Sequence, residues 1–311
     1  MIDPATLPLP LVVEPLDFES IYQAQLADFT ALMGSEWTAA LESDPVVKML
    51  ECNSYREMLL RARINDAARA VMPAFAVGSD LDNIAARFGV TRLVITPSDP
   101  TASPPVAEVL EGDARLRQRY FLALDGRTTA GPSSMYKYLA LTASPLVNAV
   151  QVVGPALTWT DGVPGTSNGV PPGQVNVYIQ STAGNGTLGV PDSTLLNVVT
   201  AYLNGITVRP LCDTVNVLPV TLVNVAIAAT IYVYPGASSI EIMAQANAAA
   251  TAYQTGLGIG DDVCRSAIIG NLWVPGVESI VVTLPSADVI MGMGQIANIT
   301  GFTLTPGGVR V

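Results

Sequence analysis

Residues 214–240 read TVNVLPVTLVNVAIAATIYVYPGASSI, and this stretch decides between a membrane-spanning and a β-sheet fold. It contains no charged side chain, and roughly 20 consecutive apolar residues are enough to span a bilayer as a helix. However, Pro219 and Pro235 interrupt it, and β-branched residues alternate along parts of it with a period of two. We therefore predict two buried strands, over residues 214–218 and 223–234, in place of a membrane helix.

Working outward from this stretch, short strand patterns and helix patterns alternate along the chain. After residue 130 the expected order is helix, strand, glycine- and proline-rich loop, strand, helix, strand, strand, helix, short helix, strand and a final β segment. The ranges are 131–141, 147–153, 159–173, 175–180, 191–204, 214–218, 223–234, 239–254, 263–272, 279–284 and 296–304. This order predicts the α+β class, with an N-terminal helical region followed by two small α+β sandwich-like units.

The first part of the chain is expected to be an arm followed by helices. Residues 1–18 contain four prolines and would gain order by lying on another surface. Helical patterns follow over residues 18–37 and 45–72, and a third over DARLRQRYFLALDG, which begins at residue 113. The second helix is predicted to bury one stripe, made of Val46, Leu50, Tyr55, Leu59, Ala62 and Val71.

A linker rich in proline and serine over residues 96–106 separates this helical part from the rest of the chain. The glycine- and proline-rich loop near residue 170 marks a second boundary. We therefore divide the chain into residues 1–95, 96–173 and 174–311.

Composition limits the classes of function. The net charge is −11 and the pI is about 4.4, which argues against nucleic-acid binding. The chain has no histidine, so Ser-His-Asp and Cys-His catalysis are excluded within it. Its three cysteines, Cys52, Cys212 and Cys264, lack metal-site spacing and read as reduced thiols of a protein folded in a cytoplasm. The N-terminus is typical of neither a signal peptide nor a transit peptide.

Charge is distributed unevenly. Only 13% of the residues are charged, about half the usual share for a soluble protein, and residues 1–130 hold 29 of the 41 charged side chains. The C-terminal part is therefore the better candidate for large protein interfaces, whose cores are depleted in charge. We expect the isolated protein to be oligomeric or poorly soluble.

The stretch GSDLDNIAARFGVTR (residues 78–92) carries two nearby carboxylates, Asp80 and Asp82. We interpret it as a short helix with Ser79 or Asp80 as N-cap, an apolar face that includes Leu81, and an end at the left-handed position of Gly89. These carboxylates are then structural.

Two further motifs could carry chemistry. GNGTLG places Gly184, Gly186 and Gly189 in a GxGxxG pattern after a predicted strand, with Asp213 beyond it. We interpret this as a strand-to-helix loop, because a fresh helix with Pro191 as its first residue and Asp192 in its first turn would place negative charge where a phosphate must bind. Asp261 and Asp262 are expected to cap the helix that follows them. No residue is assigned a catalytic, cofactor-binding or metal-binding role.

Several segments, taken in order, resemble the baseplate J-like family of contractile phage tails and related contractile injection systems. They are LDNIAARFGVTR, DARLRQRYFLALDGRTTAGPSSMYKYLAL, NAVQVVGP, PGQVNVYI, VRPLCDTVNVLPV and IGDDVCRSAIIGNLWVPGVESIVVTLP. The resemblance covers roughly residues 20–300.

The resemblance implies a structural wedge subunit of the virion's tail baseplate, assembled in the host cytoplasm, with neither catalysis nor a cofactor. It implies two copies per wedge, bundled through N-terminal helices with another wedge protein, and C-terminal regions that join wedges into a sixfold ring around the hub and pass the trigger for contraction to the sheath. Sheath-initiating and tail-fibre-attachment proteins are further candidate partners; nucleic acid, membranes and small molecules are not expected. The alternatives are a carboxylate-dependent tail-associated enzyme and a host-surface binding module.

Overall fold

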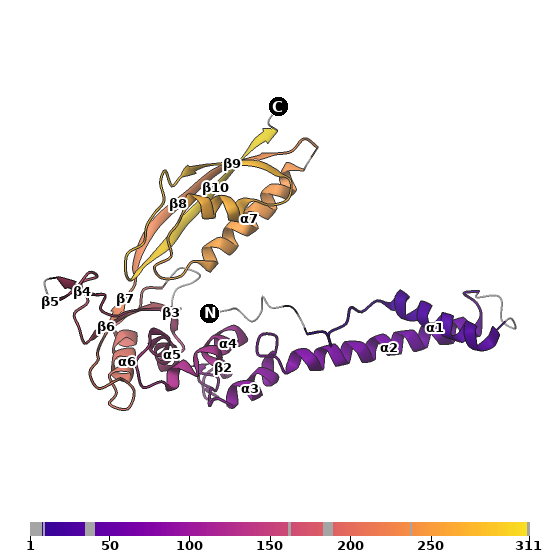
Figure 1. Cartoon of the computed structure of the whole chain (residues 1–311), viewed down its shortest axis with the longest axis horizontal. Coiled ribbons are helices and arrows are strands. Elements are labelled where there is room, and N and C mark those ends of the chain that lie inside the picture. The colour runs from indigo at the N-terminus through magenta and orange to yellow at the C-terminus, as the bar shows by residue number, and fades with distance from the viewer. Residues whose placement is uncertain are drawn as a thin grey trace. The chain divides into compact units, whose positions relative to one another are not determined.

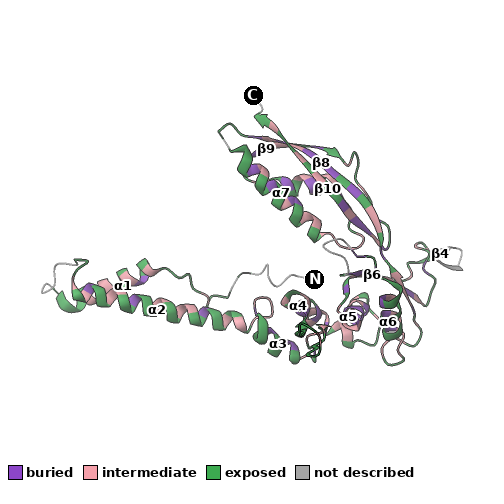
Figure 2. Cartoon of the chain, turned by 180° about the vertical axis from the view of Figure 1, so that it is seen from behind, coloured by how far each residue is buried: buried purple, intermediate pink, exposed green. Residues whose placement is uncertain are grey.

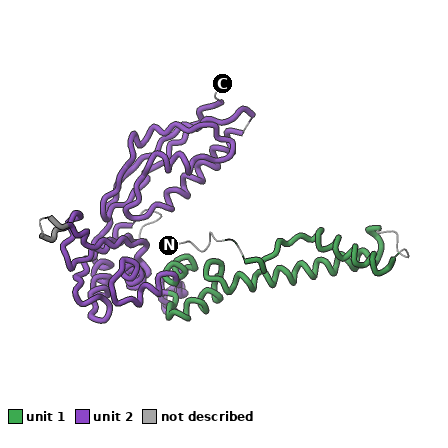
Figure 3. The backbone as a smooth tube through the Cα atoms, viewed as in Figure 1, with its two compact units in different colours: residues 1–92, 112–120 green, residues 93–111, 121–311 purple. Residues whose placement is uncertain are grey.

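A computed structural model describes residues 8, 10–34, 41–160, 163–182, 189–236 and 238–309 (Figure 1). The chain divides into two compact units (Figure 3). The first comprises residues 1–92 and 112–120, and the second comprises residues 93–111 and 121–311. The protein belongs to the α+β class, with helices first and small sheets after them, as the sequence predicts.

The first unit is helical. Its helices are α1 (Phe18–Met33), α2 (Pro45–Ala70), α3 (Gly78–Ala86) and most of α4 (Asp113–Leu122). Asp17 caps α1 by accepting from the amides of Glu19 and Ser20. Asp44 caps α2 by accepting from the amide of Val46, with Pro45 in the first turn. The expected helices over residues 18–37 and 45–72 are thus present: residues 35–37 lie outside the described residues, and α2 ends two residues earlier than expected.

A small core holds α3 and α4 in the first unit. Leu81, Ile84 and Ala85 of α3 are buried, as predicted, together with Leu116 of α4. The chain leaves α3 through Gly89, whose φ of +67° is the left-handed position expected for it.

The second unit begins with short elements that the composition did not reveal. Strands β1 (Val94–Thr96) and β2 (Val109–Leu110) pair antiparallel across the predicted linker, and a 3-10 helix, η3, spans Asp125–Arg127. A hairpin of β4 (Leu157–Thr160) and β5 (Val163–Thr166) lies in the predicted glycine- and proline-rich loop.

The first α+β layer pair is built on three strands. Strands β3 (Val147–Val153), β6 (Gln174–Ser181) and β7 (Thr214–Pro219) form a sheet in the order β3-β6-β7. β3 and β6 are antiparallel, whereas β6 and β7 are parallel. Helices α5 (Ser133–Ala143) and α6 (Ser193–Leu203) supply the other layer, and Tyr136, Val177, Ile179, Val199 and Leu203 form much of their shared core.

The second α+β layer pair repeats this plan. β8 (Thr221–Val233) is the central strand; β10 (Gln295–Val309) pairs with it in parallel and β9 (Val277–Leu284) antiparallel. Helices α7 (Ser239–Gly256) and α8 (Arg265–Leu272) cover one face of the sheet. The stretch 214–240 therefore forms β7, β8 and the start of α7, which confirms the two predicted strands.

Candidate functional site

The two carboxylates of residues 78–92 have different roles from the one that their spacing predicts. Helix α3 begins at Gly78 after Val77, and neither Ser79 nor Asp80 caps it, so that prediction is wrong. The carboxylate of Asp113, far away in sequence, accepts from the amide of Gly78 at 3.1 Å. A cap of this kind depends on tertiary packing and leaves no local sequence pattern.

Arg92 ties this region together. Its guanidinium bonds Asp82 Oδ1 at 2.7 Å, Asp113 Oδ1 at 2.6 Å and the carbonyl of Gly78 at 3.2 Å, with only 14% of its side chain exposed. The hydrogen bond from Arg92, then that from the Gly78 amide, lowers the pKa of Asp113. Asp82 and Arg92 are therefore a brace between α3 and α4 and not reacting groups.

Helix α4 is fastened to the same unit by two more arginines. Arg117 donates to the carbonyls of Pro73 at 2.9 Å and Ala76 at 2.7 Å. Arg119 is buried and donates to the carbonyl of Thr91 at 3.0 Å. Carbonyl groups at chain bends thus find partners in guanidinium groups, which carry several donors in a fixed geometry.

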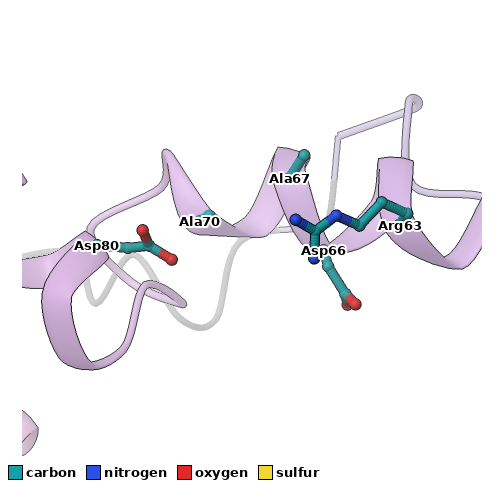
Figure 4. A pocket seen from close by; sticks show the side chains of 5 residues that line it. All are labelled: Arg63, Asp66, Ala67, Ala70 and Asp80. Carbon is teal, nitrogen blue, oxygen red and sulfur yellow. The ribbon is translucent and has the colours of Figure 1, made fainter.

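Asp80 faces a shallow hollow of about 310 Å³ in the first unit. Arg63, Asp66, Ala67 and Ala70 of α2 complete its lining. Figure 4 shows Asp80 and Asp66 on different helices, with carboxylates that point in different directions. The hollow does not present the converging pair of carboxylates that acid–base chemistry requires.

Asp261 and Asp262 brace loops in the second unit. The carboxylate of Asp261 accepts from the amide of Gly258 and that of Asp262 from the amide of Met291, both at 2.7 Å. Helix α8 has Cys264 at its N-cap position without a side-chain cap, so the predicted capping by these aspartates is wrong. Asp261 therefore braces the loop before α8 internally, whereas Asp262 joins that loop to the one before β10.

The glycine motif can be followed only in part, because Gly184 and Gly186 lie outside the described residues. Gly189 forms an isolated bridge with Ser181. Asp192 is the N-cap of α6 and accepts from the amide of Leu195 at 2.8 Å, so this helix starts two residues later than Pro191, where we expected it. That carboxylate occupies the position at which a phosphate would otherwise meet the helix amides.

Asp213, the acidic residue beyond the glycine motif, is half-buried. It accepts a hydrogen bond of 2.5 Å from the hydroxyl of Tyr136, and burial followed by this bond raises the pKa of Tyr136. Arg209 donates to the backbone carbonyl of Asp213. Asp213 is therefore a structural residue that fixes the chain before β7.

Three further features of the described residues bear on metal binding, thiol chemistry and membrane insertion. Among these residues, no cluster of three or more His, Cys, Asp or Glu side chains is placed to hold a metal ion. All three cysteines are free thiols. Among the described helices, none has the length and hydropathy needed to cross a bilayer.

Helices α1 and α2 bury few apolar side chains, chiefly Ile21 and Val47, and polar groups bond between them. Ser54, which is fully buried, donates to Gln25 Oε1 at 3.1 Å, and Gln25 Nε2 donates to Glu57 at 2.8 Å. Toward the C-terminal end of α2, Asn65 makes two hydrogen bonds to the backbone of Glu14, which hold the N-terminal arm against α2 at that residue. Polar groups that are paired in this way specify a geometry but contribute modestly to stability.

The large apolar side chains of α2 lie elsewhere. The predicted buried stripe is wrong: Tyr55, Leu59 and Val71 are exposed, and the other three members are only half-buried. A set of exposed residues with helical spacing occupies the side of α2 away from its buried residues. Much of the α2 ribbon is green, the colour of exposed residues, in Figure 2. We call this set the α2 stripe: Met49, Leu60, Ile64, Ala67 and Val71.

The α2 stripe has the character of an interface. The exposed fractions are 65% for Met49, 66% for Leu60, 55% for Ile64 and 73% for Val71. Leu60, Ile64, Ala67 and Val71 follow each other by four, three and four residues, which places them on one side of a helix. The exposed Asn53 and Arg56 separate Met49 from the other four members along the helix. Exposed apolar side chains that gather on one side of a helix are typical of a site of protein association.

The sheet of the second α+β layer pair also leaves one face open. Residues of β8 alternate between buried positions under α7 and α8 and more exposed positions opposite. The open positions of β8 and β10 carry small or polar uncharged residues, and two pairs of them bond across the strands: Asn298 with Asn224 at 2.8 Å, and Thr230 with Thr305 at 3.1 Å.

An exposed apolar stripe on a helix, an open sheet face with uncharged residues on β8 and β10, and charged groups used as internal braces are features of one class, the multidomain assembly proteins. The Baseplate J-like N-terminal domain matches residues 42–99, and the Baseplate J-like protein C-terminal domain matches residues 225–305. Baseplate protein J of Escherichia phage P2 is 38% identical over 315 residues, which cover 99% of this chain and 98% of that protein. The chain belongs to the baseplate J-like family and is a structural protein of a phage tail baseplate.

Proposed function

We propose that this chain is a wedge subunit that joins with a second copy and with other wedge proteins, forms a sixfold ring around the hub, and passes the trigger for contraction to the sheath. It acts through binding alone, without catalysis or a cofactor. Sheath-initiating and tail-fibre-attachment proteins are candidate partners. The proposal extends the family membership, which supports a baseplate role, to particular contacts.

The observation that carries this proposal is the α2 stripe. Burying a Leu, Ile, Met or Val side chain contributes about 1.5–3 kcal/mol, and four large members of the stripe are still about two thirds exposed. Covering them would contribute about 4–8 kcal/mol per copy. Association itself costs about 4–15 kcal/mol, so several such faces must combine in a bundle of more than two helices.

The charge around the stripe favours partners with acidic side chains. Arg56 and Arg63 lie on the same side of α2 as the stripe, and both are exposed. Among the ion pairs of the described residues, neither arginine takes part. A partner helix that carries Glu or Asp beside its own apolar stripe would match this face in charge as well as in hydrophobicity.

The roles of the regions follow from these surfaces. Residues 1–95 hold the arm and the partner-binding helices, residues 96–173 form a middle α+β region with linkers, and residues 174–311 form the ring. The low charge of the last region supports this assignment, because interface cores are depleted in charge. Assembly takes place in the cytoplasm of the host cell.

The test is to charge the α2 stripe and follow assembly. The variant Leu60→Asp with Ile64→Asp should fold with unchanged helicity, because both side chains are exposed, but should be lost from sedimenting tail particles. Tyr55→Asp is the matched control, since Tyr55 is exposed on another side of α2. Incorporation of the double variant at the level of the control would contradict the proposal.

A further inference from the structure

Strand β10 presents an open edge. It lies at the edge of the order β10-β8-β9, and β8 is its only partner among the described residues. Along an edge strand, the backbone groups of alternate residues point away from the sheet. At its first residue, the carbonyl of Gln295 accepts from the amide of Gly260, but β10 runs on to Val309.

The opposite edge of the same sheet is capped at one point and at its end. Arg265 donates to the carbonyl of Val282 in β9 at 2.8 Å, and to the carbonyls of Ser286 at 2.6 Å and Pro285 at 3.3 Å. Charged side chains and covering groups are the usual means by which proteins protect edge strands from pairing. β10, with the sequence QIANITGFTLTPGGV, carries no charged residue. Its own protective features are Pro306 and the register shifts at Ile299/Gly301 and Pro306/Gly308, which lie toward its two ends and leave residues 301–305 between them.

The occupant that fits this edge is a second copy of β10. Because the strand is uncharged, two copies can face each other without bringing like charges together. The chain's own N-terminal arm fits poorly, because Pro4, Pro8, Pro10 and Pro15 lack the amide hydrogens that a paired strand must donate.

Helix α7 leaves room for this pairing. It packs over β10 and β8. If two copies join at β10 through a twofold axis perpendicular to the sheet, their α7 helices lie side by side on the same face. The helix axes are then separated by about two strand spacings, or ~10 Å. Helices pack at 8–10 Å, with the shortest distances for small side chains. The exposed side of α7 carries Ala244, Ala248, Thr251, Ala252 and Thr255, and its single charged residue is Glu241.

We propose that β10 pairs antiparallel with β10 of a second copy and joins the two sheets into one. The inference rests on the proposed function, in which residues 174–311 form the ring, and it names the strand and the symmetry of one ring contact. Two bulges, at Ile299/Gly301 and Pro306/Gly308, leave a regular stretch between them. In an antiparallel pair, residues that lie opposite each other point to the same face of the sheet. The twofold axis must therefore pass through a residue position and not between two residues. The residues at the middle of the regular stretch are Thr303 and Leu304, and we place the axis at one of them.

Two Thr303 side chains would therefore lie opposite or diagonal to each other, about 5–8 Å apart. Thr303 is exposed on the open face, so a charge there leaves the fold intact. The experiment uses the full chain with Leu60→Asp and Ile64→Asp as background, which removes association through the α2 stripe. Sedimentation over a concentration series compares this background with Thr303→Lys, Thr303→Glu and an equimolar mixture of the two.

We expect each charged variant to weaken association about two- to fivefold, because like charges meet across the axis, and the mixture to restore it. Val281→Lys, on the open face of β9, is the control and should leave association unchanged. An unchanged Thr303→Lys, a mixture no better than its components, or a background protein that stays monomeric throughout would overturn the proposal.

A separate measurement distinguishes failure of this inference from failure of the proposed function. Tail particles that carry Thr303→Cys are treated with a short thiol cross-linker, and the cross-linked peptides are identified by mass spectrometry. A link between two copies of residue 303 supports the β10 pairing. Particles that contain the chain but lack this link would contradict the β10 pairing and leave the proposed function standing. Absence of the chain from the particles would contradict the proposed function.

Discussion

Replacing Arg92 by alanine should destabilise the first unit by about 2–3 kcal/mol. Its pair with Asp82 is half-exposed and contributes about 0.2–1 kcal/mol. Its bonds to Asp113 and to the Gly78 carbonyl are more buried, and loss of a hydrogen bond to a charged group costs about 1.5–3 kcal/mol. Asp82→Asn should therefore cost about 0.5 kcal/mol, much less than Arg92→Ala.

The assay is native-state hydrogen exchange of the α3 amides, which reports the local free energy of opening even when the two units unfold separately. Arg87→Ala is the matched control, because Arg87 is exposed on the same segment, and its effect should stay within about 0.5 kcal/mol. Equal effects of Arg87→Ala and Arg92→Ala, or a loss below about 0.5 kcal/mol for Arg92→Ala, would refute the reasoning.

The same brace predicts a dependence on pH. The pKa of Asp113 in the folded protein lies below its ordinary value of 3.8. The stability it contributes is therefore fully present above that ordinary value and is lost as the pH falls through the lower, folded value. Exchange of the Gly78 amide should accelerate over this acid range beyond its intrinsic rate. A variant with Asp113→Asn should lack this added acceleration, and retention of it would contradict the assignment.

Two further predictions concern the second unit. Tyr136→Phe should lower its stability by about 1–2 kcal/mol in urea unfolding, because Asp213 loses a partly buried donor; no loss would contradict the role of this bond. Gly294→Ala should cost more than about 2 kcal/mol, since φ is +70° and a Cβ would lie 2.2 Å from the ring of Tyr178. Gly270→Ala in α8 meets open space and should stabilise by about 0.5–1 kcal/mol, so the two alanines should differ in sign.

Local patterns were sufficient for most elements of the fold. β3 has the bounds that the sequence predicts, and β8 and α7 differ by a few residues, because short β-branched runs and helical periodicity depend on neighbouring residues. β1, β2, β4 and β5 were missed, because each has only two to four residues and lies in or beside a segment rich in glycine, proline and serine, which is typical of loops. The family was also recognised correctly from ordered segments.

Caps and surfaces could not be predicted from local patterns. The cap of α3 comes from Asp113, which no spacing rule connects with Gly78. Six apolar residues of α2 were expected to be buried, whereas the buried residues of the helix are Val47, Ser54 and Asn65, and Ser54 bonds to α1. Periodicity identifies an apolar side but does not say whether the same chain or a partner covers it. The apolar residues of α2 are exposed in the isolated chain, as expected for an assembly protein whose partners cover them.

The central claim is that this chain is a ring-forming wedge subunit, and imaging of intact tails by cryo-electron microscopy tests it most directly. The account predicts two copies per wedge in a sixfold ring at the tail end, with the α2 stripe buried in a helical bundle. A ring in which Leu60 and Ile64 remain exposed to solvent, or tails whose baseplate lacks the chain, would contradict it.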